Sequence, residues 1–309
     1  MTRTTTRLYA QLGLLAAVLA GGASAPFWLD AYYLGIFTIA YYFGVFAMSW
    51  DLLFGYAGEV NFGPTFLIGI GAYAAGIMNN HGVPLPLCII GGAAAAIVGG
   101  LFLAIPALRL RGPYFGLVTL VAVLLLLDCI VIFASVTGGE IGMMVPEVLS
   151  VSAKVNYWYA FAFMAVSGAI LFGLSRSSLG LILQATGQDR IEAQALGFNV
   201  TKHKLAAFVI SALFSGLAGA MLTFYQGTAS VDQMVDLAIA VQIIIAVVFG
   251  GRRTILGGVL GAIFLVYFNE LLRPIGQLNT LVVSGIALLV ILFLPDGVLG
   301  YLLRPREGR

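Results

Sequence analysis

Residues 113–136 read PYFGLVTLVAVLLLLDCIVIFASV, a run of 24 residues that carries a single charge, Asp128. A helix needs about 20 apolar residues to cross the hydrocarbon core of a bilayer, so this run predicts a membrane-spanning helix. Over the 309-residue chain, hydrophobic residues make up 61% and charged residues 9%, whereas roughly a quarter of the residues in soluble domains are charged. One soluble core could not bury so much apolar surface, so the composition predicts an all-α polytopic membrane protein.

Nine further apolar segments flank this run, which gives about ten transmembrane helices in a single domain, residues 1–309. The predicted spans are 8–25, 32–50, 61–78, 85–106, 113–136, 156–174, 205–226, 236–251, 254–272 and 277–295. A signal peptide is an alternative for the first span, because Arg3 and Arg7 precede an apolar run that ends in Ala23-Ser24-Ala25. The uncharged stretch 8–29 is long enough to cross the bilayer and favours a retained helix.

When the ten segments are threaded back and forth, the basic side chains separate by side of the membrane. One side receives only Lys154 and Arg273, and the other receives Arg3, Arg7, Arg109, Arg111, Arg176, Arg190, Lys202, Lys204, Arg252, Arg253, Arg304, Arg306 and Arg309. Because positively charged loops stay in the cytoplasm, both termini are predicted to be cytoplasmic and the chain to lie in the bacterial inner (plasma) membrane. The basic residues follow the sidedness of the membrane rather than forming a patch, so membrane lipid is expected around the chain and no nucleic-acid partner is expected.

Few residues suited to catalysis or metal binding are present. His81 and His203 lie far from any second plausible ligand, and the sequence contains no Walker-type phosphate loop or nucleophile–base pair. Cys88 and Cys129 fall within apolar segments without ligand spacing, and we interpret both as small buried hydrophobic residues. We therefore expect a chain that is no enzyme and holds no cofactor or metal of its own.

Two stretches at the ends of apolar segments are rich in helix-breaking residues: FGYAGEVNFGP at 54–64 and FGGRRTILGG at 249–258. Non-helical backbone at membrane depth persists only where protein or a water-filled cavity satisfies it. Paired glycine-broken segments also point to the binding region of a transporter. Two ordinary cytoplasmic turns are the alternative interpretation. Glu59 and Asn61 of the first stretch are candidates to line a translocation pathway.

Polar residues within the apolar spans or directly after them are the other pathway candidates: Asp128, Thr137, Gln226 and Gln242. A charge within a bilayer costs at least about 2.5 kcal/mol and usually faces a bundle interior or a cavity. We expect Asp128 either to face the pathway, near a substrate ammonium group, or to be a structural acid that is paired to a partner helix or protonated. Thr and Gln in a span often only bond a neighbouring helix.

The longest charged segment between apolar spans covers residues 175–204, on the predicted cytoplasmic side. Asp189 with Glu192 three residues later is a capping-box pattern that begins a helix, and Gly197 stands where a helix-ending glycine belongs. The pattern predicts a helix of about two turns over 190–196. Its apolar face carries Ile191, Ala195 and Leu196. A helix this short is unstable alone and needs a groove in which to dock.

This segment resembles the permease subunits of ABC importers, and within them the LivM-like half of the Liv-type branched-chain amino acid permeases. The similarity rests on EAQALGFNVT at 192–201, KLAAF at 204–208 and SGLAGA at 215–220. Further motifs match in order: GYAG at 55–58, RGPYF at 111–115, Thr137-Gly138-Gly139 with Gly142, and Gly250-Gly251 with Gly257. The resemblance covers about residues 30–300 and implies a type II-like ABC importer permease fold.

In that family the cytoplasmic segment acts as a coupling helix that sits in a cleft of the ATPase subunit. By resemblance, the residues that couple to the ATPase are Asp189, Arg190, Ile191, Glu192, Ala193, Ala195, Leu196 and Gly197. The implied partners are a second homologous permease in a heterodimer, two cytoplasmic ATPase subunits that hold ATP and Mg, and a periplasmic solute-binding protein. ATP binding would move the helix and switch the pore between inward- and outward-facing states.

Departures from the family pattern leave the substrate open. Glu59 and then Asn61-Phe62-Gly63-Pro64 stand where relatives commonly carry a Gln and a Ser-Leu-Gly-His run, and Leu124 stands where the family often has an acid. A branched-chain amino acid is expected, with another amino acid, urea, an amide or an organic acid as alternatives. An ion-coupled secondary transporter or a channel is the alternative function. An ion-coupled transporter usually needs several embedded ionisable residues, and this sequence has one central acid. A channel is disfavoured because no selectivity-filter motif occurs.

Overall fold

The structure is a computed structural model that describes residues 19–110 and 113–276, together with Gly13, Leu278, Leu281, Val282 and Gly285. Within these residues the elements are helices, apart from two strands of two residues each. Six helical segments are long and apolar enough to cross a membrane. The chain is therefore an all-α, multi-pass membrane protein, as its composition predicts.

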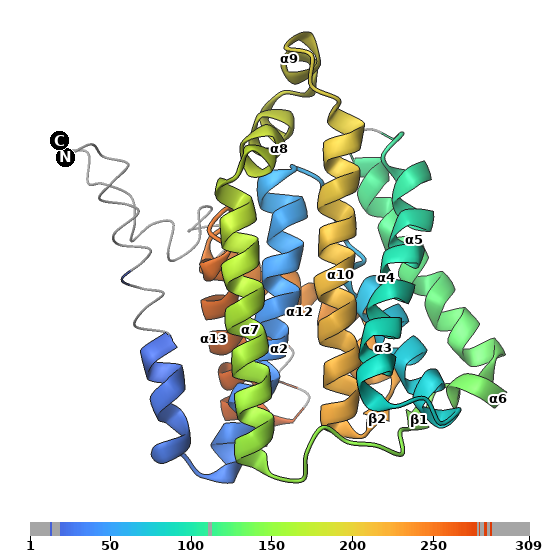
Figure 1. Cartoon of the computed structure of the whole chain (residues 1–309), viewed down its shortest axis with the longest axis vertical. Helices are drawn as coiled ribbons and strands as arrows, with labels where there is room; N and C mark the ends of the chain where they lie inside the picture. The colour runs from blue at the N-terminus through green and yellow to red at the C-terminus, as the bar shows by residue number, and fades with distance from the viewer. Residues whose placement is uncertain are drawn as a thin grey trace.

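The long helices form one bundle (Figure 1). The six spanning segments are α2 (Ala31–Asp51) with its π-helical continuation η2 (Leu52–Tyr56), α4 (Leu85–Ala107), α5 (Pro113–Ile132), α7 (Ala153–Arg176), α10 (Val200–Gln226), and α11 (Val231–Met234) with α12 (Leu237–Gly250). Two shorter helices complete the bundle, α3 (Pro64–Asn80) and α13 (Leu256–Leu272). Single 3-10 turns occur at η1 (Ala25–Phe27) and η3 (Arg273–Ile275).

Three predicted boundaries are wrong, each for a local reason. The third span begins at Pro64 rather than at 61, because proline suits the first position of a helix. The fifth ends at Ile132 rather than at 136, and α6 (Ala134–Thr137) follows as a separate turn after Phe133. The seventh begins at Val200 rather than at 205, where the side chain of Asn199 accepts a hydrogen bond from the N–H of Lys202.

The remaining predicted spans that fall on described residues correspond to helices α2, α4, α7, α12 and α13. Most of the predicted first span, 8–25, lies outside the described residues, although residues 19–24 are helical. Most of the predicted tenth span, 277–295, and both chain ends also lie outside them.

Glycine allows the central helices to approach closely. α10 packs against α2, α3 and α4. A Cβ atom added at Gly71 of α3 would lie 2.5 Å from the carbonyl oxygen of Gly216 in α10. A Cβ atom added at Gly92 of α4 would lie 2.5 Å from the carbonyl oxygen of Gly71. Because helices in lipid associate through close packing rather than by expelling water, these contacts hold α3, α4 and α10 together.

The two ends of the bundle differ. α8 (Ser178–Gln188) and α9 (Arg190–Ala195) project at one end, and α6 with strands β1 (Met143–Met144) and β2 (Thr228–Ala229) lies at the other (Figure 1). The strands are antiparallel, with Met143 paired to Ala229. The described basic residues assigned to the cytoplasmic side lie at the α8–α9 end: Arg109, Arg176, Arg190, Lys202, Lys204, Arg252 and Arg253. Lys154, at the start of α7, and Arg273, just after α13, lie at the opposite end.

Candidate functional site

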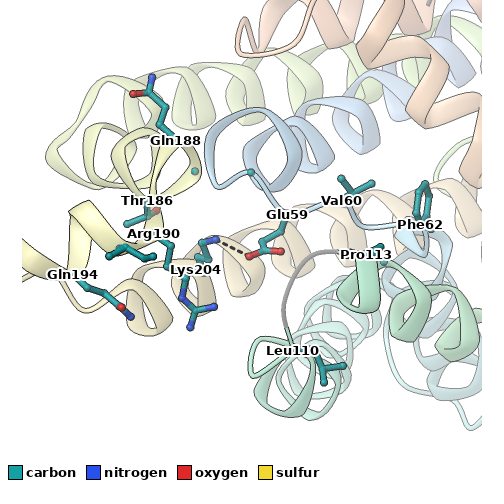
Figure 2. Close-up of a pocket in the computed structure, with 14 residues that line it drawn as sticks. Glu59, Val60, Phe62, Leu110, Pro113, Thr186, Gln188, Arg190, Gln194 and Lys204 are labelled. Atoms are coloured by element: carbon teal, nitrogen blue, oxygen red, sulfur yellow. Dashed lines mark hydrogen bonds and ion pairs between the residues drawn. The ribbon is translucent and has the colours of Figure 1, made fainter.

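A pocket of about 720 Å³ opens at the α8–α9 end of the bundle (Figure 2). The chain from Gly58 to Phe62, Leu110 after α4, the start of α5, helices α8 and α9, and the start of α10 surround it. Its apolar lining includes Val60, Phe62, Leu110, Pro113 and part of Ile191, and its polar lining consists of Glu59, Thr186, Gln188, Arg190, Gln194 and Lys204. The pocket thus joins the glycine-broken stretch 54–64 to the predicted coupling segment 175–204.

An ion pair lies at the polar wall of this pocket. Lys204 Nζ is 2.6 Å from Glu59 Oε1 (Figure 2), and the two side chains are only 8% and 16% exposed. Lys204 belongs to the beginning of α10, whereas Glu59 precedes α3. An ion pair that is mostly removed from water constrains its two side chains more tightly than an exposed ion pair does. It therefore fixes the stretch around Glu59 to the helix that directly follows α9.

The predicted helix after Asp189 is present as α9. Asp189 caps it, because Asp189 Oδ1 accepts hydrogen bonds from the N–H groups of Ile191 at 2.7 Å and Glu192 at 3.0 Å. Gly197 has a φ of 88°, the left-handed conformation expected of a glycine that ends a helix. The preceding helix α8 was not predicted from the sequence, which gives this segment as a loop. The signal that indicates this helix is its apolar run Leu181-Ile182-Leu183 within the charged segment.

The α9 helix presents apolar side chains to solvent. Ile191 is 77% exposed and Leu196 is 74% exposed, whereas Ala193 is buried against the rest of the chain. The exposed coupling candidates also include Asp189, Glu192, Ala195 and Gly197, while Arg190 is half-buried beside the pocket. A partner protein that covered Ile191 and Leu196 would remove apolar surface from water, which favours binding.

The two glycine-broken stretches meet through Asp51, the last residue of α2. Its carboxylate is fully buried; Oδ1 accepts a hydrogen bond from the N–H of Arg253 at 3.0 Å and Oδ2 one from the N–H of Ile255 at 3.1 Å. Arg253 Nε donates to the carbonyl oxygen of Gly55 at 2.7 Å. Asp51 is not predicted from the sequence, because it stands one residue beyond the predicted span 32–50 and its partners are more than 200 residues away in the chain.

Two of the predicted pathway residues make local structural bonds. Asn61 is buried; its Oδ1 accepts from the N–H of Gly63 at 2.8 Å, and its carbonyl oxygen accepts from Trp50 Nε1 at 2.6 Å. The hydroxyl of Thr137 donates to the carbonyl oxygens of Ile130 and Phe133 at the end of α5. These contacts shape the backbone around each residue, as side chain-to-backbone bonds commonly do.

The other pathway candidates lie apart from the pocket. Asp128 is exposed on the outer surface of α5, and Gln226 and Gln242 are half-buried on α10 and α12. The Oε1 atom of Gln226 is buried and has no hydrogen-bond partner among the described residues. Glu59 is therefore the pathway candidate that the structure brings into the pocket with the coupling segment. Its role in a pathway stays a prediction.

The cysteines differ from expectation. Cys88 is buried, but Cys129 is exposed beside Asp128, so the interpretation of both as buried hydrophobic residues is wrong for Cys129. α5 is covered on one side only, and the two residues lie on its uncovered side. Across residues 19–110 and 113–276, no three His, Cys, Asp or Glu side chains are grouped as metal ligands.

The known proteins to which this chain is similar are permease components of transport systems. Residues 32–294 match the family model described as branched-chain amino acid transport system / permease component. The chain is 28% identical to the high-affinity branched-chain amino acid transport system permease protein LivM of Escherichia coli (strain K12), over 92% of this chain and 74% of the relative. It is 29% identical to the autoinducer 2 import system permease protein LsrC of Enterobacter sp. (strain 638), over 69% and 63%. It is 28% identical to the ribose import permease protein RbsC of Haemophilus influenzae, over 55% and 50%. No solved structure gives a significant match.

Proposed function

Because the chain belongs to the family of branched-chain amino acid transport system permease components, we propose that it carries a branched-chain amino acid or a similar small polar solute. The chain is a permease subunit of an ABC importer and lies in the inner membrane as a multi-pass protein. Its relatives are transport subunits rather than enzymes. ATP and Mg are held by separate partner ATPases under this proposal, and hydrolysis of the ATP drives alternating access in the permease.

The observation that carries the ATP-driven mechanism is the exposed α9 helix. This helix has six residues, is capped by Asp189 and projects at the end of the molecule (Figure 1). Its Ile191 and Leu196 side chains are uncovered. A helix of this length is stable only when it is packed, and it lies on the α8–α10 framework through Ala193. The proposed occupant of its outer face is a cytoplasmic ATPase subunit, in a groove that receives Ile191 and Leu196.

The charge distribution supports the proposed orientation. Among the described basic residues, seven lie at the α8–α9 end and two at the opposite end. The positive-inside bias then makes the α8–α9 end cytoplasmic, which is the side on which an ATPase would bind. Ten transmembrane helices with both termini in the cytoplasm, and one permease domain over residues 1–309, complete the proposed topology.

A second homologous permease is proposed to pack along α5. Asp128 is exposed on this helix among exposed apolar residues, including Leu124, Leu125 and Ile132. A carboxylate that faced lipid would be costly, so this surface is better covered by protein or by a water-filled pathway. In a heterodimer, Asp128 would face the pathway between the two permeases, and Glu59 would line it at the α8–α9 end.

The substrate class follows the relatives only in part. LivM is named for branched-chain amino acids, LsrC for autoinducer 2 and RbsC for ribose. These solutes differ in charge, so the family relationship by itself does not choose among them. An exposed acid on α5 favours a solute that carries an ammonium group, and an amino acid has one. A periplasmic solute-binding protein would deliver the solute to the opposite end of the bundle.

The test is purification and reconstitution of the whole importer. The chain is expressed with the ATPase, second-permease and binding-protein genes that accompany it, purified through a tag on this chain, and placed in vesicles. We expect the ATPases to co-purify and uptake of a radiolabelled branched-chain amino acid to require internal ATP and the binding protein. Uptake by this chain alone, driven by a proton or sodium gradient, would instead establish a secondary transporter, and passive flux would indicate a channel.

A further inference from the structure

Tyr56 lies between the cytoplasmic helices and the turn that joins α12 to α13. Its carbonyl oxygen is so close to Gly187 of α8 that a Cβ atom at Gly187 would lie 2.7 Å from it. On the other side, the Tyr56 hydroxyl donates a hydrogen bond to the carbonyl oxygen of Arg253 at 2.9 Å. Tyr56, at the end of η2, therefore contacts two segments that are distant from it in the sequence.

The contact between α8 and the end of η2 is a direct packing of backbones. A Cβ atom added at Gly58 would lie 2.9 Å from both the Cα and the carbonyl oxygen of Gly187. Such spacing is possible only because both positions are glycine. α9 continues from α8 through Asp189, which ends one helix and caps the next. A displacement of α9 would thus reach η2 with no flexible side chain in between.

The turn on the other side of η2 has an unusual backbone. Arg253 and Ile255 have positive φ values of 64° and 46°, and a positive φ is strained for a β-branched residue such as isoleucine. The turn is held in this shape by the carboxylate of Asp51, which accepts the N–H groups of both residues. Because Asp51 directly precedes η2, the turn is fastened to the same short segment that α8 contacts.

A π-helical segment such as η2 is itself a local departure from regular helix, and such departures are common at functional sites. We propose that Tyr56 and Asp51 are positioning residues for energy coupling, through which movement of α8 and α9 is passed to the α12–α13 hairpin. This inference rests on the proposed function, since it requires that an ATPase moves α9. It adds a specific route, through η2, to the part of the bundle formed by α12 and α13.

The test compares two tyrosine-to-phenylalanine substitutions in α2 and η2. Tyr56→Phe removes only the hydroxyl, which donates to Arg253 and also interacts with Ser175 of α7. Tyr41→Phe is the matched control, because Tyr41 is also buried and its hydroxyl is hydrogen-bonded to that of Tyr157 at 2.7 Å near the opposite end. In the reconstituted importer, we measure solute molecules taken up per ATP hydrolysed. We expect a decrease of about fivefold for Tyr56→Phe, the order expected for one lost hydrogen bond, and none for Tyr41→Phe.

A second pair of variants examines the carboxylate. Asp51→Asn leaves one side-chain oxygen to accept a hydrogen bond, where the carboxylate has two. Because one of the two N–H groups then loses its acceptor, we expect a decrease of about tenfold in uptake per ATP with ATP hydrolysis retained. Asp236→Asn is the control, because Asp236 caps the opposite end of α12 by accepting from the N–H of Ala238. The uptake-to-ATP ratio separates coupling from a structural defect, which would lower the amount of assembled importer and leave the ratio unchanged.

The outcomes are distinguishable. Wild-type ratios in both Tyr56→Phe and Asp51→Asn would overturn the inference while leaving the importer function intact. A fall in assembled complex at an unchanged ratio would also overturn it, because both residues would then only support the fold. If the wild-type complex shows no ATP-dependent uptake, the proposed function fails before the variants are compared.

Discussion

Lys204 Nζ lies 2.6 Å from Glu59 Oε1, and this ion pair joins the start of α10 to the glycine-broken stretch before α3. Both side chains are mostly removed from water, so each charge is compensated by the opposite charge of its partner. The pair also closes one side of the pocket that α8 and α9 share with the α4–α5 connection. It is thus a fixed contact between the helix that follows α9 and the main bundle.

Removal of the Glu59 charge should destabilise the protein. Glu59→Gln leaves the ammonium group of Lys204 largely buried without a counter-charge, and we expect a loss of about 1–3 kcal/mol. The apparent melting temperature of the purified importer measures this loss. Adding Lys204→Met to Glu59→Gln removes the uncompensated charge and should restore most of it. An unchanged melting temperature for the single variant would show that the pair contributes little.

The outer face of α9 should be required for binding of the ATPase. Ile191→Glu places a charge where an exposed apolar side chain is expected to be buried by the partner, and burial of such a side chain contributes roughly 1.5–3 kcal/mol. We expect at least about tenfold less ATPase to co-purify with the tagged permease. Val151→Glu is the matched control, because Val151 is 97% exposed at the opposite end. Equal recovery of the ATPase with both variants would exclude this face as the docking surface.

The sequence predicts the helical spans because hydropathy acts over twenty neighbouring residues, and it predicts the cap of α9 because Asp189 and its donors lie within three residues. It does not predict α8, which is amphipathic and too short for a membrane span. Hydropathy also fails at Val200, where the polar residues Lys202, His203 and Lys204 begin α10. In that case the capping side chain, Asn199, is the better signal.

The candidate site was predictable only where its contacts are local. Both glycine-broken stretches were recognised from composition, but their meeting depends on Asp51 bonding residues 202 and 204 positions later. The hydrophobic periodicity of a sequence does not indicate a contact between residues so far apart in the chain. The position of Cys129 shows the same gap, since an apolar segment indicates burial in a membrane but does not tell which face contacts protein.

The end of α9 should depend on glycine at position 197. Gly197 has a φ of 88°, and a side chain added there would meet no atom within 4 Å, so only the backbone conformation restricts the residue. Gly197→Val should cost about 1–2 kcal/mol, because L-residues are disfavoured in this region. Gly197→Asn should cost less, since asparagine tolerates it. Recovery of the ATPase and uptake should therefore fall for valine more than for asparagine, and equal effects of the two would refute this account of the helix end.

The α5 surface around Asp128 should be reached by water in the assembled importer. Cys129 is exposed next to Asp128, and Cys88 is buried, so a Cys88→Ala variant carries one native thiol for labelling. Only the thiolate reacts readily, and hydrocarbon does not support a charged group. We expect a small charged thiol reagent to modify Cys129 in the reconstituted complex, and substrate with the binding protein to slow the reaction. We also expect Asp128→Asn to lower uptake by about tenfold, because it removes a charge from the proposed pathway without changing its shape. An unreactive Cys129 together with normal uptake by Asp128→Asn would place this face of α5 against lipid or dry protein, and the pathway would have to be sought elsewhere in the bundle.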